Sequence, residues 1–208
     1  MRLPRTATLV IAAATAAVWL LTMLIGAQDR ASFVLGVIPA RLSGLLEIAP
    51  AVPAWLTPLS STLAHGGMLH LALNMLMLVW CGTKVERSLG SGSLVTLYIV
   101  GAYAAAIAQW LMSPLSTTPM IGASGAISAV IGAFSLTFGQ QKRLVRSPSL
   151  NRALNALWLL AAWVVLQTMT GFLAGVQGVL LATPAHVGGF LAGLLLQRPL
   201  LLWRYRSA

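Results

Sequence analysis

Two short stretches of this sequence carry side chains that could act together as a nucleophile and a base. Ser124 lies among small residues in Gly122-Ala123-Ser124-Gly125, where an apolar segment begins. His186 has a similar position in Ala185-His186-Val187-Gly188-Gly189, at the start of another apolar segment. A serine hydroxyl is a poor nucleophile alone, and neutral histidine is well suited to take its proton near neutral pH. The pair therefore indicates attack on an acyl group.

Acyl attack also needs hydrogen-bond donors for the oxyanion that it creates. His70 and Asn74 are four residues apart in a third apolar segment, so they share one face if that segment is a helix. The first backbone N–H groups of the segment that carries Ser124 have no intrahelical partners. We expect these N–H groups, His70 and Asn74 to form the oxyanion site. His65 either joins them or braces the start of its segment.

Few other peptide-cleaving chemistries are open to this chain, because its only acidic residues are Asp29, Glu47 and Glu86. A single aspartate cannot form an aspartyl dyad, and no His-Glu-x-x-His zinc motif is present. Glu86 falls at the opposite end of its segment from the histidines, so a Ser-His dyad is more economical than a triad. His65 and His70 would lie about 140° apart on a helix, which disfavours a metal shared with His186. No metal or cofactor is expected.

The composition places these residues in a membrane protein. Of the 208 residues, 58% are hydrophobic and 8% are charged, whereas about a quarter are charged in soluble domains. The length allows roughly six spanning helices of about 20 residues with short connections. We expect one all-α polytopic membrane domain over 1–208, with no soluble domain appended. The net charge of +10 does not indicate nucleic acid, because the basic residues are dispersed at segment ends.

The predicted spans cover about 6–27, 60–82, 93–112, 121–139, 154–174 and 184–202. The first is longer than the apolar region of a signal peptide, which favours a retained first helix. The segment 28–58 mixes charged and apolar residues, so we expect an outer loop at the membrane interface. Glu86 and Arg87 are expected to form a structural pair after the second span. The loop 175–183 is uncharged.

The basic residues predict the orientation of the spans. Of the 13 Lys and Arg residues, all but Arg30 and Arg41 fall at the N-terminus, after the second and fourth spans, or around the end of the sixth. By the positive-inside rule both termini are cytoplasmic. Ser124, His186 and His70 then share one depth in the outer half of the membrane. We expect Ser124 about three residues into its helix, roughly 5 Å below its outer end.

Small residues predict that the fourth and sixth spans touch. The fourth span has Gly125, Ala129 and Gly132, and the sixth has Gly189 and Gly193, with small residues recurring at a spacing of four. Such spacing lets transmembrane backbones approach closely. The contact would bring Ser124 within hydrogen-bond reach of the histidine on the sixth span. Gly122 and Gly125 would also leave room for a substrate backbone.

The chain resembles the rhomboid intramembrane serine proteases over about 55–202. The resemblance rests on Gly122-x-Ser124-Gly125, on His65 with His70-x-x-x-Asn74, on Val85-Glu86-Arg87 with the glycine-rich turn after it, and on Ala185-His186-x-x-Gly189-x-x-x-Gly193. It implies a six-transmembrane-helix rhomboid-like bundle in which Ser124 is the nucleophile and His186 the general base. His70, Asn74 and the Ser124 N–H would be the oxyanion site.

The same resemblance implies cleavage of transmembrane segments of other proteins near the outer face, with the fifth span and the loop after it moving aside. Two features depart from the family. Members often have a tyrosine four residues after the nucleophile, supporting the histidine ring, and here that position is Ser128; the Trp-Arg pair often found in their first outer loop is also missing, although Trp55 precedes Leu56 in a comparable region. What holds His186 therefore stays open. The alternative function is a catalytically silent rhomboid-like protein that binds or escorts membrane clients. The lack of a targeting extension suggests a bacterial inner membrane; substrate and oligomeric state stay open.

Overall fold

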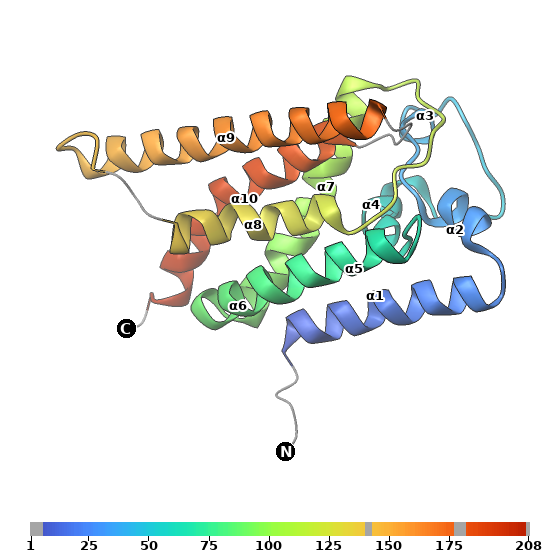
Figure 1. Ribbon diagram of the computed structural model, residues 1–208, viewed down its shortest axis with the longest axis horizontal. Coiled ribbons are helices and arrows are strands. Elements are labelled where there is room, and N and C mark those ends of the chain that lie inside the picture. Colours follow the sequence, from blue (N-terminus) through green and yellow to red (C-terminus); the bar gives the residue numbers. More distant parts are fainter. Residues whose placement is uncertain (1–5, 140–142, 177–181, 207–208) are drawn as a thin grey trace, which may run out of the picture.

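Helices dominate the computed structural model, which describes residues 6–139, 143–176 and 182–206. Lys142 and most of the predicted loop 175–183 thus lie outside the described residues. The main helices pack together as a bundle (Figure 1). They are α1 (Ala7–Leu24), α5 (Met68–Met77), α6 (Thr83–Leu89), α7 (Ser91–Met112), α8 (Ser124–Phe138), α9 (Pro148–Val176) and α10 (Thr183–Arg204). A π-helical stretch, Leu78–Gly82, makes α5 and α6 one continuous helix.

Five helices are long and apolar enough to cross a membrane, by length and composition. They are Ala7–Leu24, Met68–Leu89, Ser91–Met112, Pro148–Met169 and Thr183–Arg204. The remaining predicted span is α8, which has 15 residues and a length of about 22 Å, less than the roughly 30 Å of a hydrocarbon core. The all-α polytopic class is confirmed, whereas a sixth full-length span is not found among the described residues.

The predicted start of the fourth span at Ile121 was wrong. Gly122 has a φ of +112°, which is incompatible with a right-handed helix. The chain therefore turns at Gly122, and α8 begins only at Ser124. Apolar composition could not reveal this turn, because a turn residue inside an apolar run has the same hydropathy as a helical one.

Short helices gather at one end of the bundle, at the right in Figure 1. They are α2 (Gln28–Leu35), α3 (Pro39–Leu42), a 3-10 turn at Ala54–Leu56, α4 (Thr57–Ser60) and a second 3-10 turn at Ser61–Leu63. The buried residue Val37 exchanges two backbone hydrogen bonds, of 3.0 and 2.8 Å, with Met120. The segment expected at the membrane interface is thus tied to the loop that leads into α8.

The carboxylate of Glu86 holds the start of α1. It accepts hydrogen bonds from the N–H groups of Ala7 (2.7 Å) and Thr8 (3.0 Å), and from the hydroxyls of Thr8 (2.6 Å) and Ser91 (2.7 Å). The first N–H groups of a helix lack intrahelical partners and carry partial positive charge, so a carboxylate caps them well. The predicted pair with Arg87 was therefore wrong: Glu86 is structural, but it bonds α1 and α7.

The backbones of α8 and α10 touch. A Cβ added at Gly189 would collide with the carbonyl oxygen of Gly125, and one added at Gly193 with that of Ala129. The open side of Gly125 itself faces Ala105 of α7 instead of α10. Nine of the 15 residues of α8 are buried between these neighbours. A Cβ added at Gly132 of α8 would in turn collide with the carbonyl oxygen of Phe190, so close approach of the two helices depends on glycines of both.

We expect Gly193→Ala to lower the free energy of unfolding by about 1–3 kcal/mol, because the new methyl group forces α10 away from the Ala129 carbonyl. Thermal unfolding of the purified protein in detergent measures the change. Gly92→Ala is the matched control, since nothing lies within 4 Å of a Cβ at that helical position. Equal unfolding temperatures for the two variants would contradict the close contact.

Candidate active site

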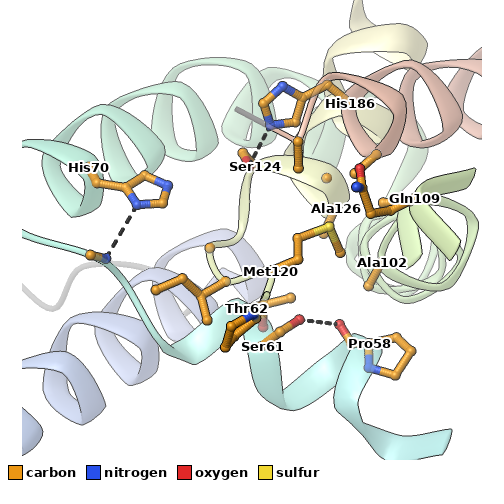
Figure 2. Close-up of a pocket in the computed structure, with 18 of the residues that line it drawn as sticks. Pro58, Ser61, Thr62, His70, Ala102, Gln109, Met120, Ser124, Ala126 and His186 are labelled. Carbon is orange, nitrogen blue, oxygen red and sulfur yellow. Dashed lines mark hydrogen bonds between the residues drawn. The ribbon is translucent and has the colours of Figure 1, made fainter. Parts of the chain in front are cut away.

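Ser124 and His186 meet where α8 and α10 begin. Ser124 is the first residue of α8 and His186 the fourth of α10. Ser124 Oγ and His186 Nε2 are 2.8 Å apart (Figure 2). The expectation that Ser124 lies three residues inside its helix was wrong, and its actual position leaves the unpaired N–H groups of the first turn beside the hydroxyl. Across the 2.8 Å between Ser124 Oγ and His186 Nε2, the hydroxyl proton can pass to the imidazole.

The other ring nitrogen of His186 contacts a residue that the sequence did not single out. Its Nδ1 lies 2.9 Å from Oε1 of Gln167 in α9. Ser128, which stands where support for the ring was considered, donates its hydroxyl to the Ser124 carbonyl oxygen (2.8 Å) and so bonds its own helix. The sequence held one signal for Gln167: it carries an amide side chain in an apolar span, and an amide that faces lipid is unfavourable.

A tight turn before α8 positions Ser124. The N–H of Gly122 donates to the carbonyl oxygen of Ser61 (2.9 Å), and its φ of +112° favours glycine. A Cβ at Gly122 would come within 2.7 Å of His70 Nε2. Glycine is therefore needed both for the backbone conformation and for the space that the His70 ring occupies.

His65 braces this turn from outside the helix. The second span begins at Met68 and not at Ser60 as predicted, so His65 lies in the segment before α5. Its Nε2 accepts from the Ala123 N–H at 3.5 Å, and its ring packs against that of His70 with centroids 5.0 Å apart. No cluster of three metal-ligating side chains occurs in the part of the chain that the structure describes. His65 was predicted to join the oxyanion site or to brace the start of its own segment, and its Nε2 contact is instead with the turn before α8.

His70 faces the site, whereas Asn74 does not. The N–H of Gly66 donates to His70 Nδ1 (3.4 Å), so the neutral ring carries its proton on Nε2, the atom beside Gly122. The buried amide of Asn74 donates to the carbonyl oxygen of His70 (3.0 Å). The structure thus brings His70 to the side of Ser124, while Asn74 bonds the backbone of its own helix.

A cavity of about 850 Å³ lies beside these residues (Figure 2). Its walls come from the turn 66–69, the loop 116–122, α7 and the starts of α8 and α10. Small residues supply much of the lining, among them Ala102, Ala105, Gly122, Gly125, Ala126 and Ala185. One hollow thus combines a hydroxyl nucleophile, a bonded imidazole and hydrogen-bond donors. This arrangement is suited to acyl transfer on an extended chain.

Fold and site together define a polytopic helical membrane protein with a serine–histidine pair in a cavity between its helices. Residues 53–203 match the family model described as the Rhomboid domain. The chain belongs to the rhomboid family and is an integral membrane protein.

Three relatives illustrate this similarity, each at 31% identity. RHOMBOID-like protein 5 of Arabidopsis thaliana is 31% identical over 138 residues, which cover 66% of this chain and 41% of that protein. Rhomboid protease GluP of Bacillus subtilis is 31% identical over 140 residues, 67% of this chain and 25% of that one. Rhomboid protease GlpG of Pectobacterium atrosepticum is 31% identical over 144 residues, 66% and 45% respectively. The matched region spans less than half of each of these relatives.

We expect Gly122→Ala to abolish labelling of the purified protein by a fluorophosphonate, which reacts with activated serines, because the methyl group displaces His70 and the turn before Ser124. Gly26→Ala is the control for backbone strain alone: Gly26 has a φ of +65° and no atom within 4 Å of an added Cβ. That variant should lose about 1–2 kcal/mol of stability and keep its labelling. Undiminished labelling of Gly122→Ala would contradict the assigned contact with His70.

Proposed function

We propose that this chain is an intramembrane serine endopeptidase in which Ser124 is the nucleophile and His186 the general base. The hydrogen bond of 2.8 Å between them carries the proposal. As Ser124 Oγ attacks the scissile carbonyl carbon, its proton moves to His186 Nε2. His186 then gives this proton to the leaving amine as the C–N bond breaks, and water hydrolyses the resulting ester.

Donors for the oxyanion lie at two places around Ser124. The N–H groups in the first turn of α8 lack intrahelical partners, and the start of the helix carries partial positive charge. Nε2–H of His70 lies on the same side of Gly122 as Ser124 Oγ, since both atoms are within 4 Å of a Cβ built at Gly122. Asn74, predicted as a further donor, bonds the His70 carbonyl in this structure, so its proposed part is to hold His70 in place.

The basic residues support a site that faces outward. Arg87, Arg204 and Arg206 lie where α6 and α10 end, while the site lies at the end that carries α2 and α4 (Figure 1). By the positive-inside rule the basic end is cytoplasmic. We therefore propose that both termini are cytoplasmic and that the cleavage site lies near the outer face. The membrane that we propose is the inner membrane of a bacterium, the source of two of the relatives above.

Transmembrane segments of other membrane proteins are the proposed substrates. A helix pairs its own carbonyl groups, so such a segment must become extended before Ser124 can attack it. The space beside Gly122 is filled by the His70 ring and that beside Gly125 by Ala105, so the room for an extended backbone comes from the cavity that both glycines line. A catalytically silent client-binding protein is the weaker alternative, because Ser124 and His186 are both present and in contact.

We expect Ser124→Ala to abolish both fluorophosphonate labelling and cleavage of a transmembrane reporter protein in liposomes. His186→Ala should lower both rates by about 100- to 10,000-fold, the usual contribution of a general base. Gel-based labelling and reporter cleavage measure these effects on the purified full chain.

Ser128→Ala is the matched control for this test. Ser128 lies one turn along α8 and bonds the Ser124 carbonyl, with no contact to the imidazole that the structure shows. It should keep both activities. Labelling that survives Ser124→Ala, or cleavage that survives His186→Ala, would disprove the dyad.

A further inference from the structure

We propose that Gln167 fixes His186 in the tautomer that accepts the Ser124 proton, an inference that rests on the proposed function of that pair. Oε1 of Gln167 is 2.9 Å from His186 Nδ1. An amide oxygen only accepts hydrogen bonds, so the ring proton lies on Nδ1. The lone pair of the neutral imidazole is then on Nε2, 2.8 Å from Ser124 Oγ.

The same contact stabilises the charged ring that the reaction forms. When the Ser124 proton moves to Nε2, His186 becomes an imidazolium whose Nδ1–H is still donated to Gln167. A hydrogen bond from an ionised donor is stronger than one from a neutral donor. The ring returns to neutral when the proton passes to the leaving amine. Because Gln167 gains and loses no proton, it is a positioning residue.

Contacts one turn away hold Gln167 against α10. Trp163 lies four residues earlier, on the same face of α9. Its indole stacks on Phe190 with ring centroids 4.7 Å apart, and its Nε1–H donates to the carbonyl oxygen of His186 (3.2 Å). The hydroxyl of Thr183 lies 3.5 Å from the Gln167 carbonyl oxygen. α9 therefore contacts both the ring and the backbone of His186.

A neutral amide suits this position in an apolar bundle. Many serine hydrolases orient the histidine with a buried carboxylate. Here the carboxylate of Glu86 is engaged at the start of α1, while Asp29 and Glu47 lie between α1 and α5. An ionised side chain inside a membrane is unfavourable, and the amide of Gln167 supplies an acceptor without a charge.

Gln167→Leu and Gln167→Glu, made in the full chain, test this role. Leucine removes the acceptor at similar size, and glutamate retains one. We expect Gln167→Leu to lower kcat for the transmembrane reporter and the rate of fluorophosphonate labelling by about tenfold or more, with KM unchanged. Gln167→Glu should keep most of the kcat and most of the labelling rate of the unmodified chain. Labelling is measured because it reports the reactivity of Ser124 without substrate binding.

Gln197→Leu is the matched control. Like Gln167, Gln197 is bonded to another helix, and it is buried and donates to the Thr137 hydroxyl at 3.2 Å, but it lies about 16 Å further along α10 than the dyad. It should lose stability and keep its kcat. Wild-type kcat in Gln167→Leu, a Gln167→Glu variant as slow as Gln167→Leu, or a loss that resides wholly in KM would each overturn the inference. Failure of the proposed function can be told apart from failure of this inference, because in that case the unmodified chain itself would not be labelled at Ser124.

Discussion

Direct contact between the backbones of α8 and α10 is the constraint on which the site depends. Gly189 and Gly193 let the carbonyl oxygens of Gly125 and Ala129 lie where side chains would otherwise stand. A strong hydrogen bond needs its two heavy atoms within about 3.2 Å of each other and well aligned. Because Ser124 immediately precedes the first of these contacts, the glycines that pack the bundle also determine its distance to the imidazole.

The apolar surroundings impose a second constraint, since polar groups in a membrane need partners within the protein. Among the described residues, Glu86 meets this need with four hydrogen bonds from N–H and hydroxyl groups and with no cation. His186 meets it with a hydroxyl on one nitrogen and an amide oxygen on the other. Both solutions use neutral partners, in keeping with a chain in which 8% of residues are charged.

Local patterns in the sequence were enough to identify Ser124, His186 and His70, because each stands in a short motif near the start of an apolar segment. Contacts between distant segments were not predictable in this way. Gln167 reaches a histidine 19 residues later, and Glu86 reaches the start of α1, 79 residues earlier. The beginning of α8 depends on the φ angle of Gly122, which hydropathy does not encode. Sequence thus predicted which side chains meet in the cavity better than it predicted the residues that hold them.

The helix that orients the imidazole is also the least buried of the candidate spans. Only 6% of the apolar stretch of α9 is buried, against 50% for that of α10, and α9 runs along the edge of the bundle in Figure 1. Segments with few buried apolar contacts are displaced at a lower free-energy cost than core helices. A displacement of α9 would withdraw Gln167 from His186 and leave the contact between α8 and α10 intact. The position of α9 against α10 and the ability of His186 to accept the Ser124 proton are therefore coupled.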